Sequence, residues 1–275
     1  CSPLALATPY SIKLLSAIMA SNIAKRRLLI LGGNGYVGQN VCHAAIRSGL
    51  FAEVRSLNRS GAPPSGSSPS HLSTSLSRVE WMSGDVLDAP AREDAMSDVD
   101  AVVSCVGAFG SNDFMQRICG DATIEAIRTA KERGVTRFGF VSSAQVYNGS
   151  AGLRLPSSAP MHGYFQGKRR AEEELLRSYP EGHVILRPGF IYGPRAVGGR
   201  VLPLQLVGGP ISFVGTRLGP ISSLIQGIPF VGKECSSMVP VESVGAAVVK
   251  SLEDVEAGKK GAILDAEAIR AYEGL

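Results

Sequence analysis

The sequence of 275 residues contains no apolar run that approaches the about 18–20 residues needed to span a bilayer. Its five cysteines are scattered and form no C-x-x-C pair, which favours buried thiols in a reducing compartment over a disulfide framework. The four histidines lack the spacing of metal ligands, so we expect no metal site.

Acidic residues are missing from positions 1–27, where Lys13, Lys25, Arg26 and Arg27 supply all of the net charge of +4. Subtracting these four from the 28 basic residues leaves 24, which the 24 acidic residues balance. A balanced fold has no basic surface for nucleic acid, so no nucleic-acid partner is expected.

Apolar side chains recur on roughly one helical face of this basic segment, at Ile12, Leu15, Ile18, Met19 and Ile23. A basic, acid-free and amphipathic segment resembles the remainder of an organellar transit peptide, or a mature arm left after its cleavage. The alternative is a disordered tail. The whole chain is 44% hydrophobic and 19% charged, which suits one large α/β domain, alone or with a small appendage.

A glycine motif follows the first apolar segment. Residues 28–31 predict a short strand buried on both faces, and a helical pattern begins directly after the glycines. The spacing G-x-x-G-x-x-G allows a sharp strand-to-helix turn, the approach of a pyrophosphate to bare backbone, and close packing of the helix. Free N–H groups and the positive end of the helix dipole would hold the phosphates. The expected dinucleotide-binding residues are Gly32, Gly35, Tyr36, Val37 and Gly38.

The end of the second predicted strand, 51–58, indicates which dinucleotide binds. NAD-selective folds usually carry Asp or Glu there to accept from the ribose 2′-OH, whereas this chain carries Arg59. An arginine without a nearby acid can pair with a 2′-phosphate, so NADP(H) is expected in preference to NAD(H). The alternative is an ordinary exposed arginine at a strand end.

Residues 60–77 are dominated by Ser, Gly and Pro, and they predict a flexible loop over the adenine end of the cofactor. A third strand is predicted at 78–83. Asp85, with Val86 beside it, is expected at the cofactor, where its carboxylate could accept from the adenine amino group. The alternative for Asp85 is to cap the next predicted helix, 88–97.

The fourth predicted strand, 101–106, ends at Gly107. Val106 and Gly107 are expected to contact the nicotinamide half of the cofactor, because a glycine lets the backbone approach it. A long helical pattern, 113–134, and a fifth strand, 136–142, follow. The alternation of strands and helices predicts an α/β fold with a doubly wound parallel sheet and right-handed crossovers, the Rossmann fold.

Three residues near the end of the fifth predicted strand could carry catalysis: Ser143, Tyr164 and Lys168. Tyr and Lys at i and i+4 of a helix point the same way. A nearby ammonium favours the phenolate, whose pKa is otherwise about 10, and Ser143 could hold a substrate carbonyl or hydroxyl. The alternative is a surface Tyr and Lys, because Y-x-x-x-K also occurs by chance.

Taken in order, these motifs and R-P-G-F-I-Y-G-P at 187–194 resemble the extended or atypical branch of the short-chain dehydrogenase/reductase superfamily. The resemblance implies that Tyr164 is the general acid/base, that Lys168 binds the nicotinamide ribose and tunes Tyr164, and that Ser143 orients the substrate. It also implies that the nicotinamide is contacted by the loop Pro188, Gly189 and Phe190.

Longer strings such as LGGNGYVG, SCVGAFGSN and LPLQLVGGP resemble a plant and algal organellar group of atypical reductases. That group is related to the nucleotide-binding accessory subunit of mitochondrial complex I and to proteins of ubiquinone biosynthesis. The chain departs from many extended members, which carry Asn-x-x-Gly-Thr in the helix before strand five. Arg117–Asp121 here has the sequence R-I-C-G-D, and the loss of the Asn weakens the expectation of a complete proton relay.

Residues 196–240 are apolar, punctuated by Gly and Pro, and almost uncharged. They predict an apolar pocket, a membrane-surface contact or a protein interface, with a small hydrophobic subdomain as the alternative. A closing helix at 241–253 and a last strand at 262–264 are predicted after them. The expected regions are an N-terminal arm, an NADP(H)-binding domain and an apolar C-terminal subdomain, at 1–27, 28–195 and 196–275.

Two functions are compatible with these patterns. The first is an NADP(H)-binding accessory subunit of a mitochondrial inner-membrane assembly, with respiratory complex I as first candidate. It would lie on the matrix side, bind other subunits, and reach the membrane surface through 196–240 or the N-terminal arm. The second is an NADPH-dependent reductase of a lipophilic carbonyl, such as a quinone or isoprenoid intermediate, with a plastid as the alternative location. The apolar segment and the basic arm favour the first function; Tyr164 and Lys168 favour the second.

Overall fold

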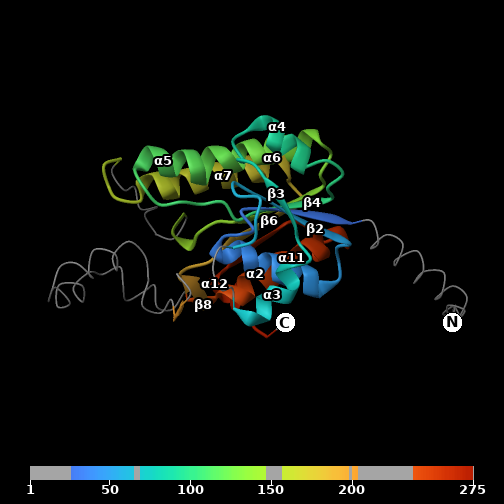
Figure 1. The fold of residues 1–275 in the computed structure, drawn as a ribbon. Helices are drawn as coiled ribbons and strands as arrows, with labels where there is room; N and C mark the ends of the chain where they lie inside the picture. Colours follow the sequence, from blue (N-terminus) through green and yellow to red (C-terminus); the bar gives the residue numbers. More distant parts are fainter. Residues whose placement is uncertain (1–25, 65–68, 147–156, 198–199, 204–237, 275) are drawn as a thin grey trace, which may run out of the picture.

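The computed structural model describes residues 26–64, 69–146, 157–197, 200–203 and 238–274. Seven parallel strands form one sheet in the order β11-β6-β5-β4-β1-β2-β3. Helices α4, α5, α6 and α7 cover one face of this sheet, and α2, α3, α11 and α12 cover the other (Figure 1). The predicted doubly wound parallel sheet is therefore confirmed.

Short strands alternate with helices along the chain. The strands of the sheet are β1 (Arg27–Leu31), β2 (Glu53–Asn58), β3 (Glu80–Ser83), β4 (Ala101–Ser104), β5 (Arg137–Val141), β6 (His183–Arg187) and β11 (Ala262–Asp265). The helices are α2 (Tyr36–Ser48), α3 (Ser70–Leu76), α4 (Ala89–Ala95), α5 (Asn112–Gln116), α6 (Ala122–Glu132), α7 (His162–Ser178), α11 (Val241–Glu256) and α12 (Ala266–Arg270). Two small ladders complete the described part: parallel β7 (Ile191–Tyr192) with β10 (Val239–Pro240), and antiparallel β8 (Pro194–Val197) with β9 (Arg200–Pro203).

The central strand β1 divides its side chains between two cores. Leu28 and Ile30 pack in the cluster beneath α2 and α11. Leu29 and Leu31 pack in the cluster beneath α6 and α7. All four are fully buried, which explains why the strand is a continuous apolar run instead of an alternating one.

The predicted flexible loop at 60–77 is wrong over its second half, because Ser70–Leu76 forms the helix α3. Leu72 and Leu76 are spaced i, i+4 and are both buried in the core beneath α2 and α11. Two apolar residues one helical turn apart were enough to anchor a short helix in an otherwise polar segment.

The predicted helix at 113–134 is interrupted. A π-helical turn, Arg117–Asp121, separates α5 from α6, and Gly134 then ends the helix with φ +76°. At this turn the helix lies very close to α7, since a Cβ on Gly120 would be 2.8 Å from Cα of Gly167. Two glycines thus allow α7 to pack against the turn.

The C-terminal part of the chain is built into the same layers. The predicted last strand is confirmed as β11, which pairs with β6, and the closing helix α11 packs on α2. Most of the apolar segment 196–240 and residues 1–25 lie outside the described residues, so the subdomain and membrane contacts expected there stay predictions. Among the described helices, none combines the length and apolar character needed to cross a bilayer.

Candidate functional site

The glycine loop lies where the strand order of the sheet reverses. β1 and β4 are neighbours there, although their following helices cover opposite faces (Figure 1). In open α/β sheets, ligands bind at this point, beyond the carboxyl ends of the strands. Cys105 N donates to Leu31 O at 3.0 Å, and a Cβ on Gly32 would lie 3.8 Å from Val106 Cγ2, so the two loops are in contact.

The three motif glycines serve different purposes. Gly32 adopts φ +78°, which L side chains rarely allow. A Cβ on Gly38 would lie 2.2 Å from Gly32 O, so this position must be a glycine for the helix to pack. A Cβ on Gly35 would meet only Gly32 O, at 3.2 Å. The packing of the protein therefore requires a glycine at position 38 more strictly than at position 35. The space beside Gly35 suits the close approach of a ligand.

The start of α2 has the features of a phosphate site. Gly35 is its N-cap residue, and no side chain caps the helix, whose first turn holds Tyr36 and Val37. A fourth glycine was missed by the sequence analysis: Gly33 donates its N–H to Ser56 Oγ at 3.1 Å, and a Cβ there would lie 2.4 Å from the same oxygen. The sequence could have indicated this role through the two consecutive glycines, Gly32 and Gly33, but not through their contact with the small residue Ser56 of β2.

Arg59 lies directly after β2, as predicted, and is exposed. In the part of the chain that the structure describes, no carboxylate pairs with its guanidinium. The neighbouring Asn58 uses its Oδ1 on the turn, accepting from Ser60 N at 3.1 Å and from Ser60 Oγ at 2.8 Å. Arg59 is thus the charged group available at the position where an acid would select NAD.

Asp85 is exposed at the same edge of the sheet, and its Oδ1 accepts from Leu87 N at 2.9 Å within its own loop. The alternative of a helix cap is wrong for Asp85, because Asp88 is the N-cap of α4 and accepts from Ala91 N. Val86 is buried in the core, so only its backbone remains near the predicted adenine site. A Cβ on Gly107, beyond β4, would meet nothing within 4 Å, which leaves room at the predicted nicotinamide position.

Tyr164 and Lys168 lie together on α7, beside the end of β5. Lys168 is buried and donates from Nζ to Val141 O at 2.6 Å. Its Nζ lies 5.2 Å from the centre of the Tyr164 ring and 4.9 Å from that of Phe140. The alternative of a surface pair is therefore wrong for Lys168, whose ammonium is enclosed by two aromatic rings and a carbonyl.

Burial governs the protonation of this pair. It raises the pKa of the Tyr164 phenol, and the nearby Cys119 thiol acts in the same direction. It lowers the pKa of Lys168, against opposing effects from Cys119, Cys105 and Glu172. The expected lowering of the tyrosine pKa is therefore wrong for this arrangement, in which burial raises it. Tyr164 is held in its protonated form, which is the form that donates a proton.

Ser143 is buried at the end of β5, where its hydroxyl donates to Gln145 Oε1, and no hydrogen bond joins it to Tyr164 in the described residues. The next residue, Ala144, donates its N–H to Pro188 O at 2.8 Å. Phe190 O in turn accepts from Val239 N at 2.8 Å. The predicted loop Pro188, Gly189 and Phe190 therefore lies beside Ser143 and is held at both ends.

A buried ion pair that the sequence analysis missed supports this corner of the site. Glu172, one turn beyond Lys168 on α7, is fully buried and accepts from Arg187 Nη2 at 2.6 Å and from its Nε at 3.1 Å. Arg187 ends β6 and precedes the Pro188 loop. The pair joins the helix that carries Tyr164 to the strand that leads into that loop. In the sequence, only the acid four residues after Lys168 could have indicated this ion pair.

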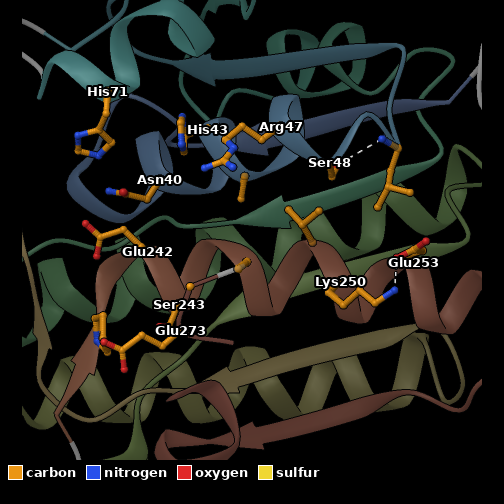
Figure 2. A pocket seen from close by; sticks show the side chains of 16 residues that line it. Asn40, His43, Arg47, Ser48, His71, Glu242, Ser243, Lys250, Glu253 and Glu273 are labelled. Carbon is orange, nitrogen blue, oxygen red and sulfur yellow. Dashed lines mark hydrogen bonds and ion pairs between the residues drawn. The ribbon is translucent and has the colours of Figure 1, made fainter. Parts of the chain in front are cut away.

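A separate groove of about 710 Å³ lies between α2 and α11. Figure 2 shows His43 and Arg47 on its α2 side and Glu242 and Lys250 on its α11 side. None of the predicted site residues lines it. No cluster of three or more His, Cys, Asp or Glu suited to a metal ion occurs in the described part of the chain.

Together, the glycine turn at the reversal point of the sheet and the Tyr–Lys pair at the same edge define a nicotinamide-dinucleotide-binding protein of the short-chain dehydrogenase/reductase type. A model of the NAD(P)H-binding family matches residues 32–212, and the chain belongs to that family. The superfamily resemblance noted from the sequence is thereby confirmed.

Relatives span most of the chain. An Arabidopsis thaliana protein described as chloroplastic is 36% identical and covers 86% of this chain and 74% of its own length. The mitochondrial protein FMP52 of Coccidioides immitis is 28% identical over 70% of this chain and 74% of its own length. The solved structure of the Bordetella bronchiseptica enzyme WbmG in complex with NAD has a TM-score of 0.56, covers 90% of this chain and 78% of that chain, and is 19% identical, which shows the shared fold.

Proposed function

We propose that the protein is an organellar oxidoreductase that uses NADP(H) to reduce a lipophilic carbonyl compound. The observation that carries this proposal is the position of Lys168, buried with its Nζ 5.2 Å from the centre of the Tyr164 ring. An enclosed Tyr–Lys pair at the ligand-binding edge of a dinucleotide fold is suited to proton transfer.

The residues present fit a nicotinamide dinucleotide. The backbone is bare at Gly35 and Gly107, and the start of α2 has no side-chain cap. When bound, the nicotinamide supplies a hydride. Arg59, free of carboxylates in the described residues, supports the choice of NADP(H) over NAD(H) through its 2′-phosphate.

The chain's own residues would handle the proton. Tyr164, kept protonated by burial, donates from its hydroxyl to the substrate oxygen. Lys168, whose pKa burial lowers, stabilises the phenolate that remains. Ser143 would orient the carbonyl after its hydroxyl turns away from Gln145.

Two relatives support an organellar location, since one is described as chloroplastic and another as mitochondrial. The basic, acid-free segment 1–27 agrees with such a location. We propose the matrix side of the mitochondrial inner membrane, with the plastid as the alternative.

Replacing Tyr164 by phenylalanine tests the proposal. With NADPH and either decanal or the naphthoquinone menadione, Tyr164→Phe should lower kcat by about 10²–10⁴-fold. NADPH affinity and the thermal midpoint should not change, and wild type should have a lower KM for NADPH than for NADH. Tyr179→Phe is the matched control, because Tyr179 is a buried tyrosine at the end of α7, away from Lys168. Full turnover in Tyr164→Phe would contradict the proposal.

The second candidate is the accessory-subunit role, in complex I or another assembly, with a structural nucleotide. It is favoured by two observations: Ser143 donates to Gln145, and Arg117 stands at the position where extended members carry Asn, which weakens the expectation of a complete proton relay. In that case Tyr164→Phe would leave respiratory assembly and electron transfer intact. Loss of nucleotide binding would instead destabilise the assembly, because a ligand of the folded state stabilises it.

A further inference from the structure

Phe109, in the loop between β4 and α5, lies on the ring of Tyr164. The two ring centres are 5.4 Å apart and the planes differ by 19°, which is a stacked arrangement. Phe109 is nevertheless 65% exposed. One face of its ring covers the tyrosine while much of its remaining surface is open to solvent, an unfavourable exposure for a phenyl group.

The loop is fixed on both sides of Phe109. Before it, the Cys119 thiol in the π-helical turn lies 3.4 Å from both N and O of Ala108. After it, Asn112 Oδ1 accepts from Gly163 N at 3.0 Å, and Gly163 directly precedes Tyr164 on α7. Both anchors connect the loop to the helical layer that carries the tyrosine, so the stacking is a built feature and not the chance position of an exposed side chain.

Tyr164 is supported on a further side by aromatic contact. The ring of Phe165 lies 5.3 Å from it at 87°, an edge-to-face arrangement. Tyr164 thus contacts a phenyl ring on two sides, and among these three side chains only its hydroxyl can form a hydrogen bond. A polyhydroxylated ligand would gain little there, whereas a flat conjugated one could stack on Phe109.

We propose that Phe109 is a specificity-determining residue that stacks against planar, conjugated carbonyl substrates of the quinone type. This inference rests on the proposed reductase function and names its substrate class. With ring centres 5.4 Å apart the stack is offset, so part of the Phe109 face extends beyond Tyr164. A flat ring system under that part lies beside the tyrosine, and the Tyr164 hydroxyl donates to its carbonyl oxygen. A flexible aliphatic carbonyl of similar hydrophobicity gains much less from the exposed phenyl face.

The test compares menadione with decanal in the wild type, Phe109→Ala, Phe109→Tyr and Phe114→Ala. Phe109→Ala should raise KM for menadione roughly 3- to 10-fold, the factor expected for one aromatic contact, and leave NADPH affinity unchanged. KM for decanal should change less than about twofold, and Phe109→Tyr should restore the menadione value because it keeps the ring. Phe114 is the matched control, since it is 44% exposed on α5 and packs against Gly110 instead.

Binding without turnover separates this inference from the proposed function. Calorimetry measures menadione binding to the protein saturated with NADP⁺, which cannot reduce it. Weaker binding in Phe109→Ala alone supports the stacking role even if the wild type reduces neither compound. Equal binding in Phe109→Ala and the wild type, no menadione binding by the wild type, or an equal KM increase for decanal would each overturn it.

Discussion

The glycine loop and the Tyr164–Lys168 corner lie at the same edge of the sheet but are held by different means. The loop is fixed by backbone atoms close in sequence, such as Gly32 O, which would lie only 2.2 Å from a Cβ on Gly38. The corner is assembled by side chains from α7, β5 and β6, including the buried pair of Glu172 with Arg187. The loop is therefore sensitive to added volume, and the corner to removed charge.

The largest effect is expected from Gly38→Ala. The new Cβ would lie 2.2 Å from Gly32 O and 2.7 Å from Gly33 Cα, both backbone atoms of a turn that cannot easily move. The free energy of unfolding should fall by about 3 kcal/mol or more, measured by urea denaturation.

Gly35→Ala is the control in the same loop. Its Cβ would meet only Gly32 O at 3.2 Å, so the fold should lose no more than about 1 kcal/mol. NADPH affinity should nevertheless fall at least about tenfold, because the methyl group takes the space of the pyrophosphate. Equal destabilisation by the two variants would remove the distinction between a packing glycine and a ligand glycine.

Glu172→Ala tests the corner by removing a charge. It would remove a fully buried carboxylate whose hydrogen bonds to Arg187 join α7 to β6, at a cost of about 3 kcal/mol in the free energy of unfolding. Glu173→Ala, at the adjacent exposed position, should change stability by less than about 0.5 kcal/mol. If both substitutions have the same small effect, the corner does not depend on this ion pair.

The same contrast explains what could be predicted from the sequence. The glycine loop and the Tyr–Lys spacing depend on residues at most six apart, so a local pattern contains the whole requirement. The sheet followed from the regular alternation of apolar and helical segments. Val86 shows the limit: the motif did not indicate that its side chain packs in the core, which leaves only its backbone for the predicted cofactor contact.

Features that need tertiary contacts were not predictable. The helix α3 was hidden by a Ser-rich composition, although Leu72 and Leu76 anchor it. The π-helical turn was missed because it lies at the close contact of Gly120 with Gly167 on α7, which no local spacing encodes. The stacking of Phe109 on Tyr164 joins residues 55 positions apart, and no local spacing encodes it.

The smallest effect concerns a histidine outside both regions. His43 lies in the groove between α2 and α11 (Figure 2), where burial lowers its pKa below the usual 6.5 and the positive charges of His71 and Arg47 lower it further. Its Nδ1 lies 2.9 Å from Ser75 Oγ. The acids Glu242, Glu253 and Glu273 also line the groove.

Because the folded pKa is lowered, the unfolded chain binds the proton more readily than the folded protein. The stability contributed by neutral His43 is present above about pH 6.5 and is lost as the pH falls through the lower folded pKa. Urea denaturation at pH 7.5, 6.5 and 5.5 should show a shallower fall for His43→Gln than for the wild type. His71→Gln should weaken the dependence less, since it removes only one contributing charge. NADPH affinity at a fixed pH should be equal in all three proteins, and an unchanged slope in His43→Gln would show that the groove histidine does not titrate with folding.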